Sequence, residues 1–253
     1  MITFLSIALL LISVALSAWG FFKTRQVHLR LFDLERRSEE RLATHFAQVE
    51  SLLALTRELD LPNGLQATRG WAGSPDFLLQ VLRTAIDHKP RTVVECSSGV
   101  STVVLARAMQ MLGRGHVWSL EHEPVFAEKT RAELRRHGLE AWATVCDAPL
   151  RALTLPEGNW NWYDVSGLPQ EPIDMLVVDG PPMTLQRLSR FPAVPVLDRK
   201  LAKTALVMLD DAARPDESEA VLQWINNYKW QHLGAFYAEK GLTVLSRAPT
   251  PAP

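Results

Sequence analysis

The chain has 253 residues, of which 47% are hydrophobic and 22% are charged. This composition supports one medium-sized folded domain with appendages and excludes a largely disordered protein. The 27 Lys and Arg residues against 28 Asp and Glu residues leave a formal net charge of -1. No nucleic-acid partner is therefore expected, because domains that bind nucleic acid normally carry a basic excess. The two cysteines, Cys96 and Cys146, lack metal-ligand spacing and are expected to be reduced thiols in the cytosol.

Residues 2–22 contain no charged side chain and are rich in Leu, Ile, Val, Ala and Phe. A helix of about 20 such residues crosses the hydrocarbon core of a bilayer, so the sequence predicts a transmembrane helix over residues 1–22. Basic residues follow at once, beginning with Lys23 and Arg25, and by the positive-inside rule they keep the rest of the chain cytoplasmic. The expected location is thus the membrane, with a single pass. A cleaved signal peptide is the alternative, although no basic residue precedes the apolar run.

Residues 23–60 are predicted to form a juxtamembrane amphipathic helix. Leu42, Phe46, Val49 and Leu53 are spaced four, three and four residues apart and make one apolar stripe. We expect this stripe to dock on the following domain. The alternative is a short coiled-coil seam, which would make the chain a homodimer.

From residue 61 to residue 248 the sequence alternates between helical and strand patterns. Strands are expected at 91–95, 116–120, 141–146, 173–179, 205–210, 231–237 and 241–246, and helices at 74–89, 102–112, 124–137 and 217–228. This alternation predicts an α/β domain with a doubly wound, mostly parallel, seven-stranded sheet of the Rossmann-like kind. Residues 249–253 are expected to be a flexible tail. The aromatic residues at 160–163 either wall a substrate pocket or cover the sheet as a hairpin.

Acidic residues end or directly follow several of these strands, as Glu95, Glu121, Asp179 and Asp210 do. In a doubly wound sheet, ligands bind at the carboxyl ends of the strands. A Ser/Gly loop follows the first strand and leads into a helix that Ser101 or Thr102 is expected to cap. The sequence therefore predicts a ligand site at this edge of the sheet.

The run from Val93 to Thr102 resembles the first motif of class I S-adenosylmethionine (SAM)-dependent methyltransferases. Further segments are similar to a bacterial group often called methyltransferase family 24, namely Trp71–Asp76, Val178–Pro182, Arg190–Pro195 and Leu209–Arg214. The resemblance extends over residues 68–247. It implies the methyltransferase fold and SAM as cofactor, with the methionine part of SAM held by Glu95, Ser97 and Gly99, the ribose by Glu121 and the adenine by Asp147. Ser101 and His122 are also expected to contact the cofactor, His122 by stacking on the nucleoside. His122 has the alternative of capping the next helix.

The loop departs from the family pattern at one position. The first glycine of the family motif is Ser97 in this chain, and serine suits the loop only where its backbone angles are ordinary. This departure favours a second hypothesis, in which the domain is a catalytically degenerate binding module.

Asp179 and Asp210 are the predicted catalytic residues. With Asp211 they form a set of carboxylates that suits Mg²⁺, an arrangement similar to that of catechol-type O-methyltransferases, in which a metal orients the substrate hydroxyl. In the alternative reading, Asp211 caps the loop, and Asp179 acts alone as a general base or binds the substrate.

These features together predict a membrane-anchored SAM-dependent methyltransferase. Its expected substrate is a hydroxyl group of a small molecule or of a glycan or lipid precursor. An NAD(P)-dependent oxidoreductase is less consistent with the sequence, because the loop lacks Gly-x-Gly-x-x-Gly.

Overall fold

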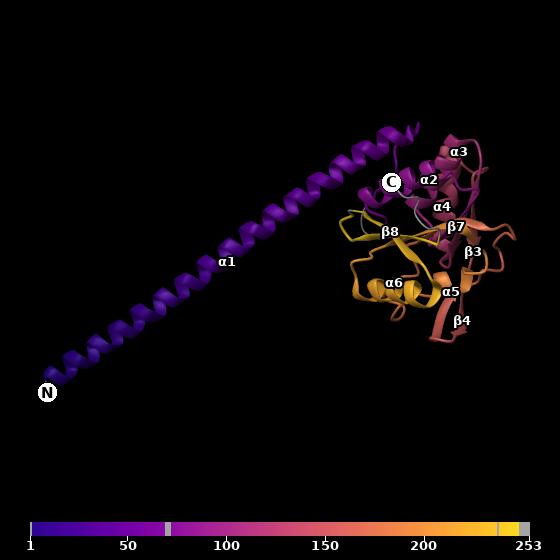
Figure 1. The fold of residues 1–253 in the computed structure, drawn as a ribbon. Coiled ribbons are helices and arrows are strands. Elements are labelled where there is room, and N and C mark those ends of the chain that lie inside the picture. Colours follow the sequence, from indigo (N-terminus) through magenta and orange to yellow (C-terminus); the bar gives the residue numbers. More distant parts are fainter. Residues whose placement is uncertain (1, 69–71, 237, 248–253) are drawn as a thin grey trace. The chain divides into compact units, whose positions relative to one another are not determined.

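The computed structural model describes residues 2–68, 72–236 and 238–247. The chain forms two compact units, Met1–Ala47 and Gln48–Pro253. The first unit is helical throughout its described length and belongs to α1 (Ile2–Leu59), whose last residues lie in the second unit. The second unit contains the α/β domain (Figure 1). Trp71, which belongs to one of the family-like segments, and the expected tail at 249–253 lie outside the described residues.

The expected transmembrane helix is wrong. Residues 2–22 are the first part of α1, which continues for 58 residues without a break into the charged segment. Among the described residues, no helix has an 18-residue stretch that is apolar enough, and poor enough in charge, to cross a membrane. The single-pass membrane location and the orientation inferred from Lys23 and Arg25 depended on that helix, and they are withdrawn with it.

The end of α1 belongs to the core of the second unit. Leu55 and Leu59 are buried there, and the Gln48 side-chain oxygen accepts a hydrogen bond from the backbone N–H of Asp76 at 3.4 Å. Val49 and Leu53 of the expected docking stripe are exposed within this same unit. The docking prediction is therefore wrong for these two residues, and a different face of the helix meets the domain.

The domain is built on a seven-stranded sheet in the order β3-β2-β1-β6-β7-β9-β8. Its strands are β1 (Thr92–Cys96), β2 (His116–Glu121), β3 (Ala143–Asp147), β6 (Ile173–Val178), β7 (Leu201–Asp210), β8 (Gln231–Phe236) and β9 (Leu242–Ser246). Neighbours from β3 to β7 pair in parallel, whereas β9 is antiparallel to both β7 and β8. The seven strands and the mostly parallel arrangement are as predicted.

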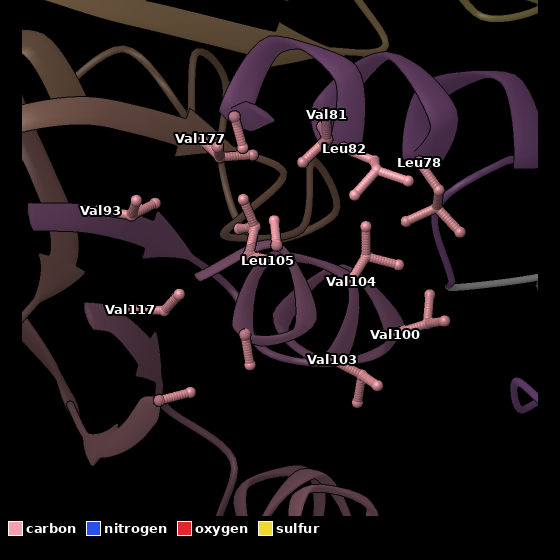
Figure 2. Packing of buried hydrophobic residues seen from close by; sticks show 14 of the residues in the cluster. Leu78, Val81, Leu82, Val93, Val100, Val103, Val104, Leu105, Val117 and Val177 are labelled. Atoms are coloured by element: carbon pink, nitrogen blue, oxygen red, sulfur yellow. The ribbon is translucent and has the colours of Figure 1, made fainter. Parts of the chain in front are cut away.

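Helices cover both faces of this sheet: α2 (Pro75–His88), α3 (Val100–Leu112), α4 (Pro124–His137), α5 (Ala193–Leu197) and α6 (Pro215–Tyr228). Alternate residues of the buried strands point to opposite faces. Val93 and Val177 thus pack with α2, α3 and α4, while Val94 and Leu176 pack with α5 and α6. Figure 2 shows the apolar side chains of α2 and α3 meeting between the two helices, beside the strand residues of the same face.

The connection from β3 to β6 contains a β-hairpin, β4 (Leu150–Leu155) and β5 (Gly158–Tyr163). Its aromatic residues turn inward, with Trp162 and Tyr163 buried in the core on the α5–α6 face. Of the two readings of this segment, the hairpin is confirmed. Its last residue, Tyr163, also reaches the edge at which the strand-end acids lie.

Candidate functional site

The carboxyl ends of five parallel strands meet at one edge of the sheet. The register aligns Glu121 of β2 with Asp147 of β3, and Cys96 of β1 with Val178 of β6. The backbone N–H of Asp179 donates to the carbonyl of Cys96 at 3.1 Å. The chain leaves β1 toward β2 on one side and returns to β6 on the other, so this edge contains the switch point at which ligands bind in such folds.

The loop between β1 and α3 has an open backbone at Gly99 and a strained backbone at Ser97. Gly99 is the N-cap of α3, and a Cβ added there would meet no heavy atom within 4 Å. The Ser97 backbone has a φ of 90°, in the region that favours glycine. The condition under which serine suits this loop is therefore not met. An open backbone at a helix N-terminus is a suitable place for an anionic ligand group.

Glu95 lies beneath this loop and is fully buried. Its carboxylate accepts hydrogen bonds from the Thr102 hydroxyl at 2.5 Å and the Ser119 hydroxyl at 2.8 Å, and the Thr102 oxygen in turn accepts from the N–H of Gly99. Burial raises the pKa of Glu95 to about 7, and the hydroxyls of Ser101, Thr102 and Ser119 oppose that rise. These contacts tie Glu95 to the loop from below, and its expected contact with the methionine part of a cofactor stays a prediction.

Glu121 is also buried, and its carboxylate is bound from two sides. One oxygen accepts from the backbone N–H and the hydroxyl of Ser98 at 3.0 and 2.9 Å. The other accepts from the N–H groups of His122 and Glu123 at 2.9 and 3.0 Å. The four bonds fill the usual capacity of a carboxylate, so a ligand hydroxyl at Glu121 has to replace one of them.

His122 and Asp147 flank Glu121. The His122 ring meets the Tyr163 ring edge-on, with centroids 5.7 Å apart, and α4 begins after Glu123 with no side-chain cap on its N-terminus. The Asp147 side chain is 67% exposed and pairs with Arg131 of α4 at 2.8 Å. Asp147 is thus the most accessible of the predicted ligand-binding acids, while His122 lies between Glu121 and Tyr163.

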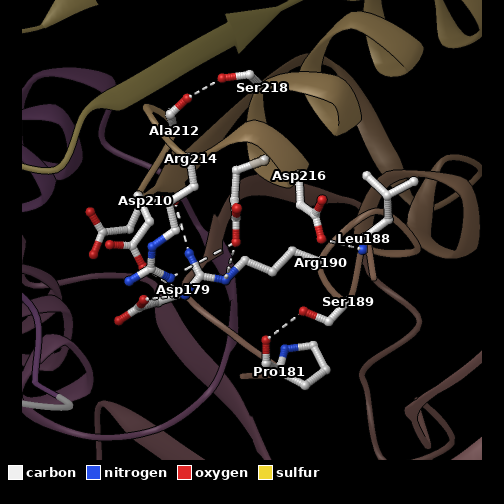
Figure 3. A network of polar contacts seen from close by, with 12 residues as sticks. Asp179, Pro181, Leu188, Ser189, Arg190, Asp210, Ala212, Arg214, Asp216 and Ser218 are labelled. Carbon is white, nitrogen blue, oxygen red and sulfur yellow. Dashed lines mark hydrogen bonds and ion pairs between the residues drawn. The ribbon is translucent and has the colours of Figure 1, made fainter. Parts of the chain in front are cut away.

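Asp179, Asp210 and Asp211 come together, as their strand ends predict. One carboxylate oxygen from each lies within 4.8 Å of the others. The guanidinium of Arg190 lies among them: Nη2 is 3.2 Å from Asp179 Oδ1 and 2.9 Å from Asp211 Oδ2, and Nη1 donates to the Asp210 backbone carbonyl at 2.9 Å. Arg214 adds a second ion pair to Asp211 at 2.8 Å. Figure 3 shows both arginine side chains converging on the acids.

Burial raises the pKa of two acids of this cluster, and it does so further at Asp210 than at Asp179. It raises the pKa of Asp179 to about 6, because the opposing effect of Arg190 is incomplete and Asp211 adds to the rise. It raises the pKa of Asp210 to about 8, with the Asp179 and Asp211 carboxylates adding to the effect. Both shifts favour the protonated form, more strongly at Asp210 than at Asp179.

A divalent cation does not fit the cluster as it is arranged. Three hard carboxylate oxygens are suitable ligands for Mg²⁺, but Arg190 bridges Asp179 and Asp211 from the position between them. A doubly charged ion at that position would meet a buried guanidinium within a few ångströms, at which like charges repel strongly. The Mg²⁺ expectation therefore depends on displacing Arg190.

Two residues that the sequence pattern did not assign to the site lie in it, and so does Tyr163, one of the aromatic residues expected either at a pocket or in a hairpin. Arg190 and Glu217 belong to the buried ion cluster, with 3.7 Å between Arg190 Nε and Glu217 Oε1. Tyr163 ends with a buried hydroxyl that has no hydrogen-bond partner among the described residues, and a Cβ added to Gly180 would lie 2.6 Å from it. Arg190 belongs to the family-like segment Arg190–Pro195. The resemblance pointed to this segment but assigned no role to the Arg190 side chain.

Comparison with known proteins bears on this arrangement. Residues 94–212 match the family model of methyltransferase family 24, described as a methyltransferase domain. No curated protein matches the chain.

Solved structures share the fold at low sequence identity. The SAH-bound methyltransferase PaMTH1 of Podospora anserina aligns with a TM-score of 0.55 and 14% identity, over 78% of this chain and 87% of its own. A methyltransferase from Geobacter sulfurreducens aligns with a TM-score of 0.52 and 17% identity, over 83% of this chain and 98% of its own. An O-methyltransferase from Bacillus cereus in complex with SAH aligns with a TM-score of 0.50 and 14% identity, over 79% of this chain and 90% of its own. Residues 94–212 are thus a class I methyltransferase domain of the family 24 type, and the chain is a methyltransferase.

Proposed function

We propose that this methyltransferase uses SAM and transfers its methyl group to a hydroxyl of a small molecule. The observation that carries the proposal is the extent of the family match, since residues 94–212 contain the glycine loop and every strand-end acid of the site. Two structures that share the fold, from Podospora anserina and Bacillus cereus, hold SAH, and the second is an O-methyltransferase. A glycan or lipid precursor with a free hydroxyl is an acceptor of the same chemistry.

The residues present suit SAM. The open backbone at Gly99 and the N-terminus of α3 favour the methionine carboxylate. Glu121 is suited to the ribose hydroxyls, one of which would replace the Ser98 hydroxyl as donor to Oε2. Asp147, exposed beside Glu121, is suited to the adenine amino group. When bound, SAM supplies a methyl group on a positively charged sulfur.

Asp179 is the acid best suited to receive the proton of an acceptor hydroxyl. Its side chain is 17% exposed, whereas Asp210 and Asp211 are buried. Arg190 holds one oxygen of Asp179 and fixes its direction, which leaves the other oxygen for the substrate. A base held in one orientation saves the entropy of aligning it during the reaction.

Cofactor binding is tested by titrating the full-length protein with SAM, SAH and NADPH in a calorimeter. We expect binding of SAM and SAH and none of NADPH. Glu121→Gln should weaken SAM binding at least about tenfold, because a hydrogen bond to a charged group contributes roughly 1.5–3 kcal/mol. Glu123→Gln is the matched control, since its side chain is 55% exposed. Equal SAM affinity in both variants would contradict the assignment of Glu121.

Methyl transfer is tested with labelled SAM and a panel of small phenols and alcohols. Asp179→Asn should retain SAM binding and lose turnover by about 100-fold or more, the usual range for a general base. A second candidate function, binding without catalysis, is favoured by the strained Ser97. It predicts SAM binding with no turnover on any acceptor.

A further inference from the structure

The cation that lies among the strand-end carboxylates is part of the protein. Nη2 of Arg190 bridges Asp179 and Asp211, and the oxygens of these acids and of Asp210 lie within 4.8 Å of one another. A metal ion shared by the three acids would have to lie in the same place. The guanidinium thus takes up the contacts that a divalent ion would make.

Arg190 is held in this position by its surroundings. It is 5% exposed, and it precedes the buried Phe191, whose carbonyl accepts a hydrogen bond from the Trp224 indole at 2.9 Å. The hydroxyl of Ser189, the residue before it, donates to the Pro181 carbonyl at 3.1 Å (Figure 3). A long side chain anchored at both its base and its head does not swing aside readily.

The charges of the cluster also argue against a metal ion at this position. Three carboxyl groups, those of Asp179, Asp211 and Glu217, pair with two guanidinium groups, those of Arg190 and Arg214. Arg190 keeps its charge because a guanidinium is not deprotonated in proteins, and a second cation would meet that charge.

We propose that Arg190 replaces the divalent cation in this site, and that Arg190 with Asp179, rather than a metal, orients the acceptor hydroxyl. The orienting role rests on the proposed O-methyl transfer. The replacement of the metal does not, because it follows from the cluster alone and is measured without turnover.

The test is a Mn²⁺ titration of metal-free full-length protein, followed by the electron paramagnetic resonance signal of free Mn²⁺. The wild type should bind no stoichiometric Mn²⁺ at concentrations up to about 1 mM, the weak end of protein sites for divalent ions. Arg190→Met keeps the bulk of the side chain and removes its charge, so it should bind one Mn²⁺ at least about tenfold more tightly than the wild type. Adding Asp210→Asn to Arg190→Met should abolish that binding.

Arg187→Met is the matched control. Arg187 lies three residues earlier, is 65% exposed and pairs with Glu219 outside the cluster, so this variant should behave as the wild type. Stoichiometric Mn²⁺ binding by the wild type, lost in Asp179→Asn, would overturn the proposal. A folded Arg190→Met variant that binds no Mn²⁺ would overturn it too. Should Arg190→Met not fold, the wild-type titration decides alone. If a methyl acceptor is found, turnover should be equal in EDTA and in Mg²⁺.

Discussion

Ser97 adopts a backbone conformation that costs a serine more than a glycine. Its φ is 90°, and residues in such sparsely populated regions store on the order of 1–3 kcal/mol of strain. The backbone N–H of Ser97 donates to the Leu120 carbonyl at 3.0 Å, and its carbonyl lies 3.0 Å from the Ser119 hydroxyl. The surrounding strands therefore hold the conformation in place, and the strain is concentrated in the loop expected to contact the cofactor.

Ser97→Gly is expected to stabilise the protein. Relief of the strain outweighs the greater chain entropy of an unfolded glycine, which costs roughly 0.4–1 kcal/mol. A net gain of about 1 kcal/mol should raise the midpoint of thermal unfolding by roughly 2–4 °C, measured by calorimetry. Ser98→Gly is the control and should lower it, because the Ser98 hydroxyl bonds to Glu121 and Thr130. A lower midpoint in Ser97→Gly would show that the loop is not strained.

Glu95 makes the stability of the fold depend on pH. Burial raises its pKa to about 7 from an ordinary value of 4.5, so the folded state holds this proton more tightly than the unfolded state. The contribution of Glu95 to stability is therefore fully present below pH 4.5, falls as the pH rises from there to about 7, and is lost above that.

Glu95→Gln should remove this loss. Measured by urea unfolding between about pH 5 and pH 8, the variant should gain on the wild type as the pH rises, by a few kcal/mol in total. Ser119→Ala should have the opposite effect and extend the fall to higher pH, because the Ser119 hydroxyl opposes the rise in the pKa of Glu95. Parallel stability curves for the wild type and Glu95→Gln would contradict the assignment.

The β4–β5 hairpin brings the hydroxyl of Tyr163 to the edge of the sheet at which the strand-end acids lie. Tyr163 ends β5 and is 4% exposed, and within the part of the chain that the structure describes its hydroxyl has no hydrogen-bond partner. The hydroxyl lies so close to Gly180 that a Cβ there would be 2.6 Å from it. A buried donor without an acceptor costs roughly 1–3 kcal/mol, so a ligand group that accepts from this hydroxyl would relieve that cost.

Tyr163→Phe should separate stability from activity. The variant should unfold at the same temperature as the wild type or a higher one, because it loses an unpartnered buried hydroxyl. Its affinity for SAM or its turnover should fall about tenfold, the effect of one hydrogen bond to a ligand. In Tyr228→Phe, which removes a hydroxyl bonded to Glu157, both ligand affinity and turnover should be unchanged. Unchanged binding and turnover in Tyr163→Phe would exclude a role for this hydroxyl.

Most strands of the seven-stranded sheet were predictable because they are short, largely apolar runs. The gathering of Asp179, Asp210 and Asp211 was predictable too, since parallel strands bring their carboxyl ends to one edge. Arg190 was not, because it comes from a connection that folds back over the edge after β6. The backbone angle of Ser97 likewise depends on the strands around it, which no local pattern encodes.

At the scale of the whole molecule, the boundary between the two units falls within a helix. The second unit begins at Gln48, ahead of the turn at residue 61 where the sequence suggested that the domain begins. Leu55 and Leu59 are 0% and 1% exposed in its core. Arg83 pairs with Glu58 at 2.5 Å, and Arg107 donates to the Leu59 carbonyl at 2.8 Å. The last turns of α1 are thus part of the catalytic unit.

Two truncations test this boundary. A protein of residues 48–253 should unfold at the same temperature as the full chain, as measured by circular dichroism. A protein of residues 61–253 should be unfolded or lose most of its stability, since each buried leucine contributes roughly 2–5 kcal/mol to a total of only about 5–15 kcal/mol. Leu55→Ala in the full chain should reproduce part of this loss, whereas Leu53→Ala, at a position 66% exposed, should change stability by less than about 0.5 kcal/mol. If residues 61–253 were as stable as the full chain, α1 would be dispensable to the fold, and its buried leucines would stabilise only the helix itself.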